Sequence, residues 1–152
     1  WEGQPMYNYS AFIYAKDAVN IALTGQGTLD GQAGDGTPWC WMSRDYMTDY
    51  QDDDRTALIN MNNNRVPVEE RIFGQGHFLR PNFIQVIGCE NVLVEGITLV
   101  RSPMWEVNPV RCTNVTVRGI HISTKAANND GIDPESSNVK PRGPGNHPAG
   151  GI

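Results

Sequence analysis

Several features that would assign this chain to common functional classes are scarce or missing. Only 19% of the residues are charged, the net charge is −5, and the isoelectric point is near 5.1. No basic patch or stripe is present, so nucleic acid is not an expected partner. No apolar run is long enough for a membrane-spanning helix, so a membrane is not expected either.

The chain shows no signal peptide, and it begins at Trp1 without a methionine. This start is compatible with a removed leader or with a fragment of a longer protein. The three cysteines and three histidines have no metal-ligand spacing, so no metal and no cofactor are predicted. Glycine (16), proline (10) and β-branched residues are frequent, while long helical periodicity is absent. The composition therefore favours one β-rich globular domain.

One segment of the chain is repeated. Residues 89–99 (CENVLVEGITL) recur as residues 112–122 (CTNVTVRGIHI), an offset of 23 from position 89 to position 112. A fixed period of this size indicates stacked supersecondary units. Each unit is too short for a helix pair and is rich in β-branched residues, so it predicts one coil of a parallel β-helix.

Alternation within the repeat predicts which side chains fill the interior. Successive residues of a strand point to opposite faces. Asn91 and Asn114 are placed at corners between strands, where asparagine tolerates left-handed backbone geometry and can bond along the stack. The expected interior positions are Val92, Val94, Ile97, Leu99, Val115, Val117, Ile120 and Ile122.

Cys89 and Cys112 are one repeat apart, so they are expected to lie above each other. A buried stack of two thiols is the favoured interpretation, and a disulfide between them stays open.

The region that precedes the copy at residues 89–99 is irregular. An early copy begins at Asn20, and residues 32–80 read as a loop excursion from the coil, with a short helix near Val66–Arg71. The acidic run at residues 51–55 is interpreted as a solvated loop, with a cation site as the alternative.

A third copy starts at Asn138, 24 residues after Asn114, and then decays. Val117 aligns with Pro141, and proline is excluded from central strands. We therefore expect a partial β-helix domain over residues 1–140 and a non-native-looking Pro/Gly tail over 141–152. This ending suggests that the natural domain continues and that the chain is cut or frame-shifted near Lys140.

The densest polar cluster reads Asn-Asn-Asp-Gly-Ile-Asp-Pro-Glu-Ser at residues 128–136. Asn128 and Asp130 have the same parity, so they would project from one face of a short strand. A carboxylate beside an amide suits hydrolysis, because the carboxylate can orient a water molecule and accept its proton. A simple turn is the alternative interpretation.

Together with residues 29–31, 78–85 and 102–105, this cluster resembles the polygalacturonase family, glycoside hydrolase family 28. The resemblance covers roughly residues 10–140, the N-terminal and central part of the chain. It implies a right-handed parallel β-helix, incomplete here at about four to five coils. It also implies inverting hydrolysis of α-galacturonosyl or related rhamnogalacturonan bonds in pectic polysaccharide or oligogalacturonide, and a secreted or periplasmic location.

The resemblance also implies roles for individual residues. Asp130 would be one of two carboxylates that activate water, Asn128 would support it, and Asp133 would be catalytic or structural. Arg80 and Trp105 are candidates for substrate binding, through a uronate carboxylate and by stacking on a sugar. A turn arginine and a core aromatic are the respective alternatives.

The Asp-Asp pair that the family supplies one coil later falls on Gly150 and Gly151, 20 and 21 residues after Asp130. We therefore expect this chain alone to be inactive. Two other functions stay open. One is a polysaccharide lyase, which would need Ca²⁺ held by several carboxylates. The other is a non-catalytic carbohydrate-binding β-helix.

Overall fold

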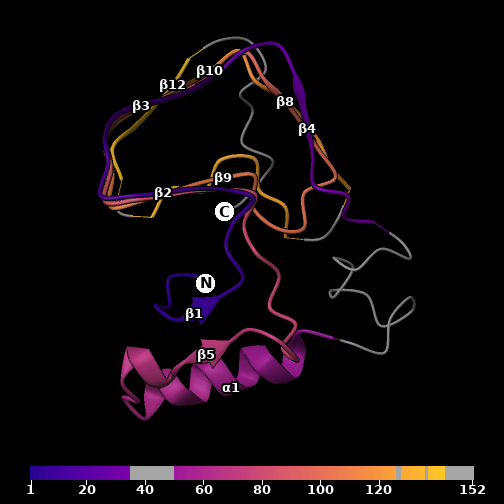
Figure 1. Cartoon of the computed structure of the whole chain (residues 1–152), viewed down its shortest axis with the longest axis vertical. Coiled ribbons are helices and arrows are strands. Elements are labelled where there is room, and N and C mark those ends of the chain that lie inside the picture. Colours follow the sequence, from indigo (N-terminus) through magenta and orange to yellow (C-terminus); the bar gives the residue numbers. More distant parts are fainter. Residues whose placement is uncertain (35–49, 126–127, 136, 143–152) are drawn as a thin grey trace.

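The computed structural model of the protein describes residues 1–34, 50–125, 128–135 and 137–142. Within them, three parallel sheets run along a stack of coils (Figure 1). Sheet 1 has the order β2-β6-β9, sheet 2 the order β12-β10-β7-β3, and sheet 3 the order β11-β8-β4. In chain order the strands are β2 (Ile13–Lys16), β3 (Val19–Thr24), β4 (Thr28–Asp30), β6 (Ile84–Ile87), β7 (Glu90–Glu95), β8 (Thr98–Val100), β9 (Val107–Val110), β10 (Thr113–Arg118), β11 (His121–Ser123) and β12 (Val139–Arg142).

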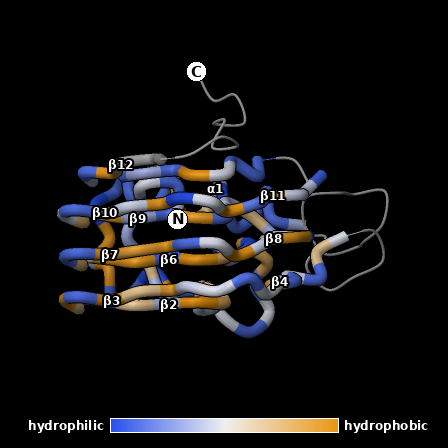
Figure 2. Tube along the Cα trace, turned by 90° about the horizontal axis from the view of Figure 1, so that it is seen from above, coloured by the Kyte–Doolittle hydropathy of each residue, from blue (hydrophilic) through white to orange (hydrophobic). Residues whose placement is uncertain are grey.

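The strands β2-β3-β4, β6-β7-β8 and β9-β10-β11 form three successive coils in the described part of the chain. A fourth coil adds β12 and two isolated bridges, from Val107 to Ile132 and from Val110 to Glu135. Figure 2 shows the coils one above another, with β3, β7, β10 and β12 stacked along one side. The parallel β-helix expected from the repeat is therefore confirmed.

The strand register follows the sequence repeat. Val115 of β10 lies opposite Val92 of β7, which lies opposite Ile21 of β3. The corner asparagines Asn20 and Asn91 are 71 positions apart, yet they belong to neighbouring coils. β4 and β6 thus belong to neighbouring coils, and the long segment between them is an insertion into the coil stack.

The expected interior positions form the main core. Seven of the eight are buried, with exposed fractions from 0% to 6%, and Ile122 is half-buried. Val94 and Val117, for example, face each other across β7 and β10. Full burial of such a side chain is worth about 1.5–3 kcal/mol, so the stacked rows supply most of the stabilisation of the coils.

The corner asparagines behave as the repeat predicts. Asn20, Asn91 and Asn114 have φ angles of 60°, 56° and 55°. Two side-chain amides donate along the stack, that of Asn91 to Oδ1 of Asn20 at 2.8 Å and that of Asn114 to Oδ1 of Asn91 at 2.7 Å. The turn after β7 requires glycine for a similar reason, because Gly96 has φ 78° and a Cβ there would collide with the carbonyl oxygen of Gly25.

Cys89 and Cys112 are buried free thiols in adjacent coils, which confirms the thiol stack and excludes a disulfide between them in this structure. The backbone N–H of Cys89 donates to Sγ of Cys112 at 3.3 Å. Burial raises the pKa of the Cys112 thiol.

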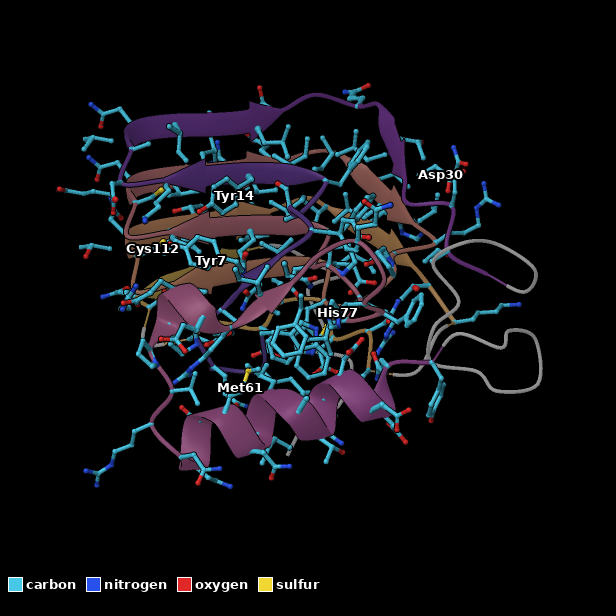
Figure 3. All side chains as sticks on the ribbon, turned by 60° about the horizontal axis from the view of Figure 1, so that its bottom comes forward. Tyr7, Tyr14, Asp30, Met61, His77 and Cys112 are labelled. Carbon is cyan, nitrogen blue, oxygen red and sulfur yellow. The ribbon has the colours of Figure 1, made fainter. Side chains whose placement is uncertain are left out.

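The described part of the insertion folds over the outside of sheet 1. It contains α1 (Asp52–Asn63), a 3₁₀ helix (Val68–Glu70) and β5 (Ile72–Phe73), which pairs with β1 (Tyr7–Asn8). Leu58, Phe73 and Leu79 form a second, smaller core there, against which Met61 packs (Figure 3). The helix expected near residues 66–71 is only the short 3₁₀ turn.

The prediction of a solvated loop at residues 51–55 is wrong, because this run forms the start of α1. Acidic side chains are favourable in the first turn of a helix, where the macrodipole is positive. Asp54 also accepts a hydrogen bond from the backbone N–H of Phe78 at 2.5 Å, and its Oδ1 lies 2.6 Å from Nδ1 of His77. The acidic run therefore ties the helix to the chain that returns to the coils.

The end of the domain also differs from the expectation. The register continues past Lys140, with Pro141 opposite Val117 and Arg142 opposite Arg118. β12 is an outer strand of sheet 2 in the described structure, and proline is tolerated in such a strand because its missing N–H can face outward. Residues 143–152 lie outside the described residues. None of the helices in the described part is long and apolar enough to cross a bilayer.

Candidate active site

The polar cluster of residues 128–135 lies on the fourth coil, beside β9 of sheet 1. The backbone N–H of Glu106 donates to the carbonyl of Asp130 at 3.1 Å, and the N–H of Asp133 donates to the carbonyl of Val107 at 2.9 Å. Farther along, the N–H of Glu135 donates to the carbonyl of Pro109 at 2.9 Å. The parallel register of the β-helix thus places three carboxylate residues of one short segment at the edge of sheet 1.

The first part of this segment is a turn and not the short strand that was expected. Asn128 lies in a turn, with a left-handed φ of 57°, and residues 129–131 form no strand. Its Oδ1 accepts a hydrogen bond from Nε1 of Trp105 at 3.3 Å, and its Nδ2 donates to Oε1 of Glu2 at 3.1 Å. The prediction that Asn128 and Asp130 project from one face rested on strand alternation, and it is therefore not supported.

The neighbouring amide anchors the turn. Asn129 is buried and donates to the carbonyl of Ser102 at 2.7 Å and to Oγ1 of Thr124 at 2.6 Å. These hydrogen bonds, to the second residue after β8 and to the residue after β11, hold the turn in place. Asp130 is the next residue in the chain, so its backbone position is fixed by this turn.

Electrostatic effects within the cluster raise the pKa of two carboxyl groups. Burial raises the pKa of Asp133, with further contributions from the charges of Asp130 and Glu135. Glu106, in the adjacent coil, is fully buried, and its pKa rises to about 8 because of burial and the charge of Asp130. Neither carboxylate oxygen of Glu106 has a hydrogen-bond partner among the described residues. Carboxyl groups with raised pKa values gather at functional sites more often than elsewhere.

Glu106 was not among the residues singled out from the sequence. One signal was available, since it is the single charged residue in the otherwise uncharged run from Pro103 to Val110. Asn108 was also missed. Its Oδ1 accepts from Asn82 and from Gln85, each at 2.8 Å, and its Nδ2 donates to the carbonyl of Asp133 at 2.8 Å. This ladder of amides links three coils on the outer face of sheet 1.

The structure contradicts substrate binding by Arg80. Its side chain is 1% exposed, its Nε donates to Oε1 of Gln51 at 2.9 Å, and its Nη1 donates to the carbonyl of Pro103 at 2.5 Å. A guanidinium enclosed in this way joins the start of α1 to the third coil and cannot reach a ligand in solution. Arg80 is therefore a buried structural arginine and not the turn arginine of the alternative reading.

Trp105 is also buried, with 8% of its surface exposed. This burial favours the core alternative over stacking on a sugar. Its indole N–H still contributes to the site, because it holds the side chain of Asn128.

No cluster of three or more histidine, cysteine, aspartate or glutamate side chains in the described ranges could hold a metal ion. The polar side chains gathered here are carboxylates and amides: Glu106, Asp130, Asp133 and Glu135 with Asn108 and Asn128. Such a set can bind sugar hydroxyls, accept a proton from water, and donate a proton where a carboxyl group stays protonated.

Comparison with known proteins agrees with this chemistry. Residues 74–140 match the glycosyl hydrolases family 28, a range that includes Glu106 and the whole polar cluster. The chain is 26% identical over 131 residues to a probable polygalacturonase of Vitis vinifera, covering 84% of this chain and 20% of that protein.

Solved structures agree as well. A hyperthermoactive exopolygalacturonase from Thermotoga maritima is 42% identical, with a TM-score of 0.80, over 90% of this chain and 34% of that one. A polygalacturonase from Erwinia carotovora ssp. carotovora is 23% identical, with a TM-score of 0.57, over 93% of this chain and 34% of that one, and it supports the fold alone. The chain thus spans about a fifth to a third of the length of these relatives. On the combined evidence of motif, fold and similarity, the chain belongs to glycoside hydrolase family 28, the polygalacturonase family.

Proposed function

We propose that this chain forms part of a polygalacturonase that hydrolyses α-linked galacturonosyl bonds, or related rhamnogalacturonan bonds, of pectic polysaccharide outside the cell. The observation that carries the proposal is the position of Asp130, which lies at the edge of sheet 1 between the buried Glu106 and the partly buried Asp133. This arrangement falls inside the range that matches the family.

Asp130 is proposed to orient a water molecule and accept its proton as the glycosidic bond breaks. Asn128 supports this turn through its bond to Trp105, and Asp133 adds a second acidic group of raised pKa nearby. Inversion also requires a general acid on the other side of the bond, with the two carboxyl groups about 6.5–9.5 Å apart so that water fits between them.

The residues at the family's Asp-Asp positions are Gly150 and Gly151, which have no carboxylate. These two residues lie outside the described part of the chain. We propose that the 152-residue chain alone binds acidic oligosaccharides but does not hydrolyse them. A purified sample that releases reducing ends from polygalacturonate, at a rate well above a buffer blank, would contradict this.

A chimera tests the role of Asp130 in a complete site. Residues 1–139 of this chain would replace the matching region of the Thermotoga maritima exopolygalacturonase, so that the remainder of that enzyme completes the coil stack. The chimera is expected to hydrolyse polygalacturonate, and Asp130→Asn is expected to lower kcat by about 10²–10⁴-fold, the usual contribution of a general acid or base.

Asp53→Asn is the matched control, because Asp53 is exposed on α1 and the change is chemically identical. Its kcat is expected to equal that of the parent chimera. Equal kcat values for Asp130→Asn and Asp53→Asn would refute the catalytic role. Products that absorb in the ultraviolet and depend on Ca²⁺ would instead indicate a lyase.

A further inference from the structure

The side chain of Asn108, on β9 in the third coil, is 0% exposed. Its Oδ1 accepts hydrogen bonds from Nδ2 of Asn82 and from Nε2 of Gln85, each at 2.8 Å. Its Nδ2 donates to the carbonyl of Asp133 at 2.8 Å and to Oε1 of Glu135 at 3.1 Å. A primary amide has two acceptor positions and two donor hydrogens, so this side chain uses its whole hydrogen-bonding capacity.

The four partners of Asn108 fix the direction in which its amide faces. Both partners in the second coil, Asn82 and Gln85, are donors, whereas both partners in the fourth coil are oxygen acceptors. Rotating the amide by half a turn would bring its oxygen against those two oxygens, so only one orientation is favourable. An ionised carboxylate has no donor, and an apolar side chain has neither donor nor acceptor. Asparagine therefore suits this position because it links donors on one side to acceptors on the other.

The bond to Asp133 completes the attachment of this residue to the third coil. Its N–H donates to the carbonyl of Val107 at 2.9 Å, and its own carbonyl accepts from Asn108. The next residue is Pro134, which has no N–H, so the peptide group between them can be held only through its carbonyl. The peptide groups on both sides of the Asp133 side chain are thus tied to β9, and the position of its carboxyl group depends on both ties.

The bond to Glu135 fixes a charge close to Asp133. Burial raises the pKa of Asp133, and the charges of Asp130 and Glu135 raise it further. The separation of the Glu135 and Asp133 carboxyl groups therefore affects how readily Asp133 ionises. Asn108 restrains this separation and adds no charge of its own.

We propose that Asn108 is a positioning residue for the reaction: through its two donated hydrogen bonds, it holds Asp133 and Glu135 in the arrangement that the active site requires. It acts on the substrate through these residues, because its buried amide has no donor or acceptor left to offer. The reaction rests on the proposed function, whereas the positioning rests on the burial of Asn108 and its four hydrogen bonds.

Asn108→Leu in the chimera removes all four hydrogen bonds. It is expected to lower kcat by about 10²-fold, since displacing a group of the active site by about 1 Å costs this much. KM is expected to stay within about threefold of the parent value, because Asn108 does not touch the substrate. The loss in kcat should be the same at every pH, since leucine does not ionise.

Asn108→Asp gives a different signature. A protonated carboxyl keeps one donor and one acceptor, whereas an ionised carboxylate loses the donor and places a negative charge beside Glu135. The groups that surround it are the carboxyl of Glu135 and the backbone of Asp133 in the fourth coil, and the neutral amides of Asn82 and Gln85 in the second coil. Burial and the adjacent carboxylate favour the protonated form, so kcat is expected to be within about threefold of the parent near pH 5 and to fall at least about tenfold below it near pH 8.

Asn63→Asp is the matched control, because Asn63 is exposed at the end of α1 and the change is chemically identical. Its kcat should equal that of the parent at every pH, and circular dichroism should show each variant folded under the assay conditions. The inference is overturned if Asn108→Leu has the kcat of the parent, or if its effect is confined to KM. It is also overturned if the loss in Asn108→Asp does not depend on pH.

Amide hydrogen exchange in the 152-residue chain separates this inference from the proposed function. Asn108→Leu is expected to speed exchange of the Asp133 amide by at least about tenfold, because the fourth coil opens locally. The amide of Leu93, on β7 between β3 and β10, should exchange as in the parent, since a general loss of stability would affect both amides. Unchanged exchange at Asp133 would overturn the positioning role, whereas a chimera without hydrolytic activity would refute the proposed function and leave the exchange result unaffected.

Discussion

Replacing Glu106 by glutamine is expected to remove a large pH-dependent loss of stability. Glu106 is fully buried, and its two carboxylate oxygens have no partner among the described residues. Burial and then the charge of Asp130 raise its pKa from 4.5 to about 8. The folded protein therefore holds this proton much more tightly than the unfolded chain does.

The sign of the effect follows from proton linkage. Below pH 4.5 the carboxyl is protonated in both states, and its contribution to folding is complete. As the pH rises, the unfolded chain ionises first and is favoured, so stability falls until the folded form ionises near pH 8. Multiplying the difference between 8 and 4.5 by about 1.36 kcal/mol per pH unit gives a loss of about 5 kcal/mol across this window.

Urea denaturation of the parent and of Glu106→Gln at several pH values between about 5 and 8 measures this directly. The glutamine side chain cannot ionise, so the stability difference between the two proteins should grow in favour of the variant by about 1.4 kcal/mol per pH unit. Its buried amide adds only a constant offset. Comparing the two proteins also cancels the similar pH dependence expected from Asp133.

Glu95→Gln is the matched control, because Glu95 is partly exposed and paired with Arg118. Its difference from the parent should stay nearly constant over the same range, as expected for an exposed ion pair. A pH-independent difference between the parent and Glu106→Gln would refute the reasoning, since it would mean that Glu106 already ionises in the folded protein at low pH.

Two further changes test the structural assignments. Arg80→Met should lower the free energy of unfolding by about 1–3 kcal/mol, because it removes the buried hydrogen bonds to Oε1 of Gln51 and to the carbonyl of Pro103. Urea denaturation would measure this with the exposed Arg118→Met as reference, and equal losses would contradict the assignment. Asn91→Ala should lower the free energy of unfolding by about 1–3 kcal/mol, because alanine disfavours a φ of 56° and the substitution removes both hydrogen bonds of the asparagine ladder. An unchanged thermal midpoint would count against the role of that ladder.

Much of the fold could be predicted from the sequence because a β-helix repeats the same local geometry. The 23-residue spacing alone placed Val92 over Val115 and identified the corner asparagines, since residues one coil apart lie directly above each other. The composition of residues 32–80 also led us to expect an excursion from the coils. The helix α1 within it was not expected, because a run of acidic residues resembles a solvated loop until its docking partners are known.

The candidate site was predicted only in part. Asp130 and Asp133 were located from their motif, and the structure places both beside β9. Arg80 and Trp105, the two candidates for substrate binding, are buried in the structure, and this burial depends on how segments distant in the chain pack over these side chains. Sequence spacing carries no information on that packing.

The sequence by itself determined the repeat, the strand register and the residues that fill the interior, because these follow from local alternation and from a constant coil length. The tertiary structure alone decided which polar groups lose contact with water. Glu106 acquires its raised pKa, and Arg80 its enclosure, only when segments distant in the chain close around them. Desolvation is a property of the folded surroundings and cannot be read from neighbouring residues in the chain.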